Sequence, residues 1–149
     1  MNRIKTFFKT LSRPGRGAGA HADKNLAAAA LMVEAAAMDG AIADREQETI
    51  RALLTSRLGL SGNEAGTLIE AAKKAQADAT HLVRFTRTLK DALGEAERTE
   101  IIEMLWRVVL ADGVVHDFED NLIRRVAGLL YVSDRARGEA KKRAEREAG

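Results

Sequence analysis

The chain of 149 residues has no cysteine, one proline and few aromatic side chains. The lack of cysteine excludes disulfides, thiol nucleophiles and thiolate metal sites. The scarcity of proline and of β-branched runs favours helices, and the many alanines at apolar positions favour close contacts between them. A chain of this length is expected to form one compact domain.

Long hydrophobic runs are also missing. No apolar stretch approaches the about 20 residues that a membrane-spanning helix needs. The N-terminal sequence MNRIKTFFKTLSRPGRGAGA lacks the continuous apolar core of a signal peptide, so export is not expected. With the absence of cysteine, these features favour a cytoplasmic protein.

Charge is distributed unevenly along the chain. The net charge is only +2, because basic ends flank a middle in which acids outnumber bases. This distribution does not predict a broad nucleic-acid-binding face.

Residues 1–21 are predicted to form a basic amphipathic arm and a linker rich in proline and glycine, and residues 22–149 a helical domain. One interpretation is that the arm, residues 1–12, makes a peripheral contact with an anionic membrane or fills a partner's groove. The other is that its phenylalanines cap the core of the domain. Its apolar side chains recur at helical spacing between lysines and arginines: Ile4, Phe7, Phe8 and Leu11.

Two acidic motifs divide the domain. MDGAIADREQE (38–48) and LADGVVHDFED (110–120) share the pattern D-G-x-(I/V)-x-D-x-E, which begins at Asp39 and again 73 residues later at Asp112. Each follows a strongly apolar helical stretch, residues 24–38 and 95–111, and precedes an amphipathic one. The duplication predicts an all-α, compact bundle of about seven helices, built from two pseudo-repeated helix–acidic turn–helix units.

Further helices are predicted over about 61–75 and 79–93, and a charged final helix is expected to open at Ser133. Ser61 and Glu64 form a capping-box pattern. Trp106 is expected in the core. Glu34 and Arg107 correspond under the repeat, and either they pair across the pseudo-twofold axis or Arg107 reaches solvent.

Turn chemistry explains most of each acidic motif. A glycine suits the end of a helix, the second aspartate suits the N-cap of the next helix, and a glutamate suits its first turn. Asp39 and Asp112 are not explained in this way, because an acid at a helix C-terminus opposes the helix dipole. The explained positions are Gly40, Asp44 and Glu46, then Gly113, Asp117 and Glu119, with Ile42 and Val115 turned inward.

A divalent-cation site is the second interpretation of these turns. The spacing matches the second half of an EF-hand loop, but the leading ligands are replaced by apolar residues, so a true EF-hand is excluded. A looser site made of carboxylates favours Ca²⁺, Mg²⁺ or Mn²⁺ over Zn²⁺. Its candidate ligands are Asp39, Asp44 and Glu46 in the first turn and Asp112, Asp117 and Glu119 in the second.

Catalysis is the third interpretation and the weakest. His116 beside Asp117 is typical of metal phosphohydrolases, but His21 and His81 do not have ligand-like spacing. No phosphate-binding loop, nucleophile elbow or histidine–carboxylate relay is visible. Neither an enzyme nor a small-molecule substrate is therefore expected.

Two segments of the chain resemble a known family. AAAMDGAIADREQETI and IEMLWRVVLADGVVHDFEDNLIRRVAGLLYVSD are similar to the TerB-like domain of tellurite-resistance proteins. The resemblance covers about residues 24–137. It implies an all-helical, non-enzymatic cytoplasmic module in tellurite and general stress responses. Such modules bind protein partners, often near the inner membrane face, and their proposed metal ligands correspond to the six acids above.

Overall fold

The computed structural model describes the backbone of residues 17–37, 42–75, 79–111, 115 and 117–148, and within these it contains seven helices and no strand. All seven were predicted from the sequence. They are α2 (Gly17–Ala36), α3 (Asp44–Leu58), α4 (Gly62–Ala75), α5 (Ala79–Ala92), α6 (Glu95–Leu110), α7 (Asp117–Leu129) and α8 (Asp134–Ala148). Residues 1–16, which include the arm, lie outside the described residues.

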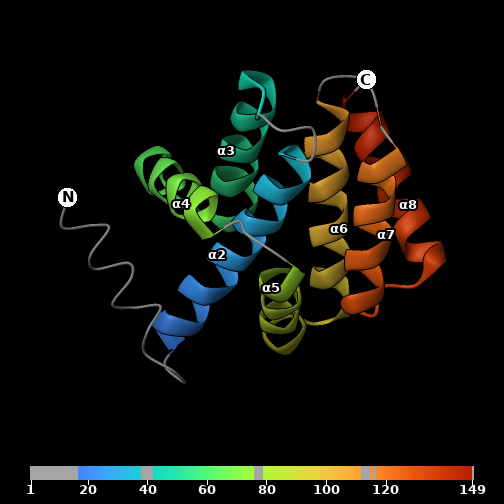
Figure 1. The fold of residues 1–149 in the computed structure, drawn as a ribbon, viewed down its shortest axis with the longest axis horizontal. Coiled ribbons are helices and arrows are strands. Elements are labelled where there is room, and N and C mark those ends of the chain that lie inside the picture. Colours follow the sequence, from blue (N-terminus) through green and yellow to red (C-terminus); the bar gives the residue numbers. More distant parts are fainter. Residues whose placement is uncertain (1–16, 38–41, 76–78, 112–114, 116, 149) are drawn as a thin grey trace.

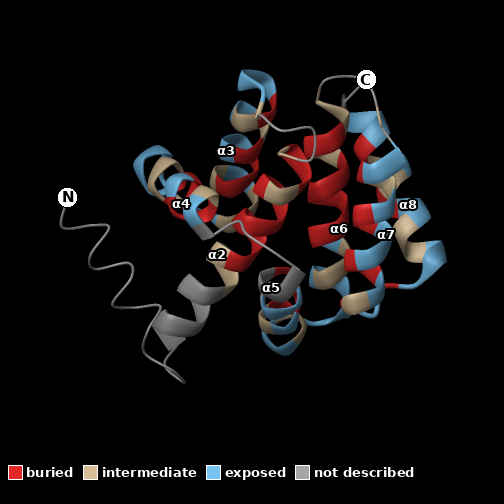
Figure 2. Cartoon of the chain, viewed as in Figure 1, coloured by how far each residue is buried: buried red, intermediate tan, exposed pale blue. Residues whose placement is uncertain are grey.

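Helix α2 lies at the centre of the fold, where it packs against α3, α4, α5, α6 and α7 (Figure 1). Its alanines make this possible, because small side chains let several helices approach one axis closely. Residues 27–33 are all buried, as Figure 2 shows along α2 and α6.

Helix α2 begins at Gly17, within the stretch predicted to be linker. Alternating alanines from Ala18 to Ala22 extend the helix backwards, since propagation is easier than nucleation.

The apolar helix α6 packs most extensively against α8, which is highly charged. Ala140 and Ala144 are one helical turn apart on α8, and both are fully buried. Their small side chains bring α8 close enough to cover Trp106, which is only 1% exposed. The expectation that Trp106 belongs to the core is confirmed.

The structure also contains helix caps at the two serines that the sequence analysis placed at helix starts, Ser61 and Ser133. The amide of Glu64 donates to Ser61 Oγ at 3.1 Å, and the amide of Ser61 donates to the Glu64 carboxylate at 2.9 Å. At the start of α8, the amide of Ala136 donates to Ser133 Oγ at 3.1 Å. These bonds satisfy backbone donors that the first turn of a helix leaves unpaired.

Of the two alternatives for Arg107, the pairing with Glu34 is wrong. The guanidinium of Arg107 instead lies 2.6 Å from the carboxylate of Glu147 on α8. Helix α8 comes after both repeated units, so the repeat gave no indication that it would supply the nearer acid.

Equivalent turns after α3 and α7 use different residues in the left-handed conformation. Gly59 ends α3 with a φ of 71°, whereas Tyr131 follows α7 with a φ of 57°. Tyr131 is the one residue other than glycine with positive φ in the described chain. A side chain in this conformation costs about 1–2 kcal/mol.

Comparing Tyr131→Gly with Tyr131→Ala isolates this strain, because both changes remove the ring. We expect the glycine variant to be the more stable by about 0.5–1 kcal/mol, since relief of strain outweighs the entropy of glycine in the unfolded chain. Urea denaturation followed by circular dichroism measures the difference. An alanine variant as stable as the glycine variant would contradict a strained turn.

Candidate functional site

The structure describes four of the six predicted cation ligands. Asp44 and Glu46 are the first and third residues of α3, and Asp117 and Glu119 hold the same places in α7. The repeat therefore places matching acids at two helix starts. Asp39, Asp112, Gly40, Gly113 and His116 lie outside the described residues.

The assignment of Asp44 as an N-cap is wrong. Ala43, with extended φ and ψ of −67° and 150°, occupies the N-cap, and Asp44 is the exposed first residue of α3. The backbone amide of Ala43 donates to the Glu46 carboxylate at 3.2 Å, so the glutamate closes this helix end. Asp117 is likewise the exposed first residue of α7 rather than the residue before it. The two aspartates interact with the helix dipole instead of capping the backbone.

Burial separates the glutamates of the acidic turns from those that close other helices. Glu64 and Glu97 make the same bond from the third helical position to the N-cap amide, and both are exposed. Glu46 and Glu119 are only 2% and 4% exposed. Glu46 and Glu119 are therefore much more enclosed than the glutamates at the starts of α4 and α6.

The predicted inward residues of the turns, Ile42 and Val115, do pack against the core. On the outer side of the first turn, Asp44, Gln47, Glu48 and Arg51 line a shallow hollow of about 430 Å³. Among the described residues, no three histidine, cysteine or acidic side chains gather as a metal site. The other two predicted ligands, Asp39 and Asp112, fall in the gaps between the described ranges.

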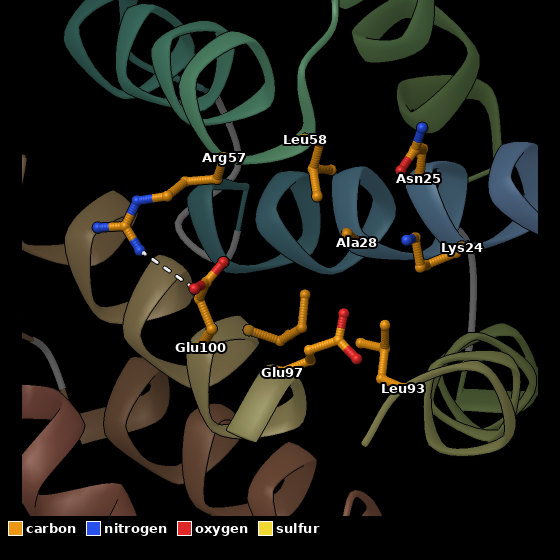
Figure 3. A pocket seen from close by; sticks show the side chains of 9 residues that line it. Lys24, Asn25, Ala28, Arg57, Leu58, Leu93, Glu97 and Glu100 are labelled. Carbon is orange, nitrogen blue, oxygen red and sulfur yellow. Dashed lines mark ion pairs between the residues drawn. The ribbon is translucent and has the colours of Figure 1, made fainter. Parts of the chain in front are cut away.

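A second pocket, of about 360 Å³, lies between the first half of α2, the end of α3 and the start of α6 (Figure 3). Its floor is apolar, with Ala28, Leu58, Leu93 and Ile101. Arg57 and Glu100 form an ion pair of 4.0 Å at one end. Lys24, Asn25 and Glu97 complete the lining. Glu97 accepts the amide of Gly94 at 3.2 Å, so its position follows from helix capping.

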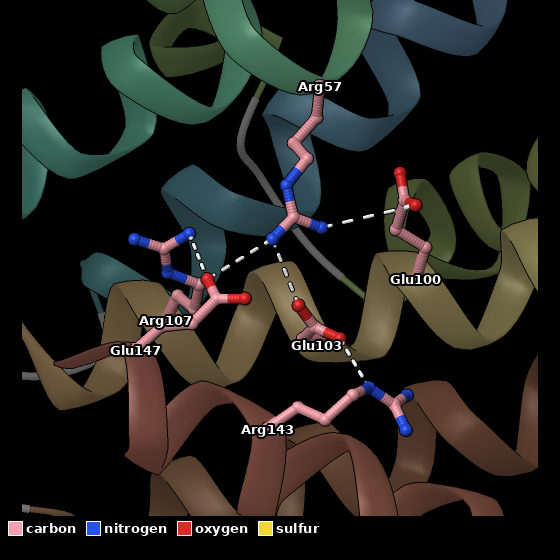
Figure 4. A network of polar contacts seen from close by, with 6 residues as sticks. All are labelled: Arg57, Glu100, Glu103, Arg107, Arg143 and Glu147. Atoms are coloured by element: carbon pink, nitrogen blue, oxygen red, sulfur yellow. Dashed lines mark hydrogen bonds and ion pairs between the residues drawn. The ribbon is translucent and has the colours of Figure 1, made fainter.

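A network of charges beside this pocket joins α3, α6 and α8 (Figure 4). Its centre is Glu103, whose carboxylate accepts hydrogen bonds from Arg57 at 3.0 Å and from Arg143 at 2.7 Å. The Glu103 side chain is 8% exposed. Glu147 on α8 accepts from Arg57 at 3.3 Å and lies 2.6 Å from Arg107.

The network changes the ionisation of its members. Burial alone raises the pKa of Glu103, but the hydrogen bonds and charges of Arg143 and Arg57 outweigh burial and lower that pKa below its ordinary value. Burial also favours a lower pKa for Arg57, and the carboxylates of Glu103, Glu147 and Glu100 raise it instead. Glu103 and Arg57 therefore both stay charged at neutral pH. Their ion pairs link α3, α6 and α8 to one another.

The sequence analysis did not identify this network. An acid inside the apolar run IIEMLW was a signal for a buried ion pair, because a carboxylate seldom enters a core unpaired. Its partners were not visible, since Arg57 and Arg143 are 46 and 40 residues away.

The fold and these sites define an all-helical domain of repeated helix–turn–helix units, with acids gathered at two helix starts. Residues 25–142 match the family described as Tellurite resistance protein TerB. The chain belongs to the TerB family. No curated protein matches it, and no solved structure matches it. No helix in the described ranges is both long and apolar enough to cross a membrane.

Proposed function

We propose that this TerB-family domain is a non-enzymatic cytoplasmic binding module whose two acidic turns hold divalent cations. The observation that carries the proposal is the burial of Glu46 and Glu119 at matching positions. A buried carboxylate is costly unless a positive charge or hydrogen bonds compensate it. Both glutamates already interact with neighbouring groups of the protein, and a cation at each turn would add to this compensation, with the exposed Asp44 and Asp117 as further oxygen ligands.

The chemistry of the donors favours hard cations. Carboxylate oxygens suit Ca²⁺, Mg²⁺ or Mn²⁺, and the chain has no cysteine that would favour softer metals. Each turn can offer three acids, with Asp39 completing the first set and Asp112 the second.

Calorimetric titration with Ca²⁺, Mg²⁺, Mn²⁺ and Zn²⁺ tests this proposal. We expect the wild-type protein to bind at least one of the first three ions, and the variant Glu46→Gln with Glu119→Gln to lose that binding. Glutamine keeps an oxygen for the capping bond, so the variant should still fold. A saturating ion should stabilise the wild type, by about 2.7 kcal/mol at a hundred times its Kd.

The matched control is Glu64→Gln with Glu97→Gln, which changes two exposed glutamates with the same capping role. It should bind the ion as the wild type does. If both double variants lose binding equally, the loss reflects overall charge and the acidic turns are not the site.

A metal-independent adaptor is the second candidate, with the domain held at the inner membrane face by its N-terminal arm. The pattern of the arm favours it, because Ile4, Phe7 and Phe8 alternate with Arg3, Lys5 and Lys9. Titrations without heat for any of the four ions would favour this candidate over the first. A role in tellurite or general stress responses follows from the family, and survival of a deletion strain on tellurite tests it.

A further inference from the structure

A row of cations runs along the outer side of α5, on a different helix from the acidic turns. Arg84, Arg87 and Lys90 follow one another at intervals of three residues, so their side chains share one stripe of the helix. Arg84 and Arg87 are exposed, and Lys90 is half-buried. In the described chain, no carboxylate pairs with any of the three. Asp91 is the only acid in α5 and lies one turn after Arg87 on the same exposed face, so three cations against one carboxylate leave this face with a net positive charge.

Tyr131 extends this stripe with an aromatic ring. The ammonium of Lys90 lies 4.9 Å from the centre of the ring, and the residue is 72% exposed. The equivalent turn after α3 uses Gly59, which adopts the same left-handed conformation without strain. Neither packing nor backbone geometry favours a tyrosine here. A strained and exposed residue of this kind is a candidate for binding.

The position of α5 in the fold indicates the shape of the partner. Helix α5 packs against α2, and the Gly17 end of α2 lies on the same lower side of Figure 1 as α5. The chain leading to Gly17 carries Arg3, Lys5 and Lys9 in its sequence. An extended anionic surface can contact the three cations of α5 and the ring of Tyr131 at the same time.

We propose that the α5 face, which comprises Val83, Arg84, Arg87, Lys90 and Tyr131, docks on a bilayer surface rich in anionic phospholipid. The three cations complement the negative headgroups, and each typically strengthens binding about fivefold. Tyrosine is favoured at the level of the headgroups, where the ring meets apolar groups and the hydroxyl meets water. Val83 is 37% exposed on the same side of α5 and adds apolar area. This inference does not depend on cation binding at the acidic turns.

Sedimentation of the full-length protein with vesicles tests the proposal. One set contains phosphatidylglycerol and phosphatidylcholine in a ratio of about 1:2, and the other contains phosphatidylcholine alone. We expect binding to the anionic vesicles only, and a loss of roughly a hundredfold in the variant Arg84→Gln, Arg87→Gln and Lys90→Gln. Tyr131→Gly should weaken binding severalfold without lowering the thermal stability.

The control variant removes three exposed cations from other helices: Arg45→Gln on α3, Lys74→Gln on α4 and Lys142→Gln on α8. It has the same net charge and the same arm as the α5 variant, so both contributions cancel in the comparison. We expect it to lose less than about fivefold. The proposal would be overturned if the two variants lost vesicle binding equally or if the α5 variant bound as well as the wild type. It would also be overturned if the wild type did not bind anionic vesicles. An unchanged α5 variant would instead direct the search to an acidic protein partner.

Discussion

Replacing Trp106 with alanine is expected to lower the free energy of unfolding by about 3–5 kcal/mol. Trp106 is the largest fully buried side chain, at 1% exposure, and it lies on α6 where α8 packs against it. The ammonium of Lys141 on α8 lies 4.8 Å from the centre of the indole. Truncation therefore leaves a cavity at the contact between the two helices and removes a cation–π interaction.

Urea denaturation followed by circular dichroism measures this loss, since the variant has no tryptophan for fluorescence. Trp106→Phe is the control. The indole Nε1 is buried without a hydrogen-bond partner in the described chain, so phenylalanine removes a desolvated donor along with part of the ring. It should cost less than half of the alanine change. A nearly neutral Trp106→Ala would show that α6 and α8 are not packed as described.

Helix boundaries were predictable from local chemistry. Ser61 and Ser133 cap the helices that follow them, and Gly59 ends α3, because each of these features depends on a few neighbouring residues. The strongly apolar stretches 24–38 and 95–111 correspond to the largely buried helices α2 and α6. Some boundary predictions failed. Helix α2 begins at Gly17 within the predicted linker, and Ala43 rather than Asp44 is the N-cap of α3, with its amide bound by Glu46.

Features that depend on contacts between distant segments were not predictable. The pairing of Arg107 follows from where α8 crosses α6, and no sequence pattern gives that crossing. Tyr131 occupies the position that glycine holds in the equivalent turn. Because tyrosine rarely adopts a positive φ, its sequence did not predict the left-handed conformation. Arg143 and Glu147 lie beyond residue 142, where the match to the TerB family ends. The charge network thus includes residues of this chain outside the matched region.

Replacing Glu103 with glutamine is expected to lower the free energy of unfolding by about 2–3 kcal/mol. The change keeps the shape of the side chain but leaves the guanidinium groups of Arg57 and Arg143 facing a neutral amide in a largely buried position. Breaking a fully buried ion pair costs about 3–5 kcal/mol, and the partial exposure of both arginines reduces that value. The control is Glu100→Gln, because Glu100 contacts the same Arg57 at 4.0 Å and its side chain is 48% exposed. It should cost no more than about 0.5 kcal/mol.

The pH dependence of stability separates the charge of Glu103 from its packing. The pKa of Glu103 is lower in the folded protein than its ordinary value of 4.5, so the folded state holds its proton less tightly than the unfolded state. The contribution of its charge is then complete above that value and is lost as the pH falls through the folded pKa. Thermal unfolding between neutral and acidic pH should therefore show a steeper acid decline in the wild type than in Glu103→Gln, with the two curves converging at low pH. Parallel curves across this range would mean that the carboxylate contributes through shape alone and that the arginines on α3 and α8 do not hold it as an ion.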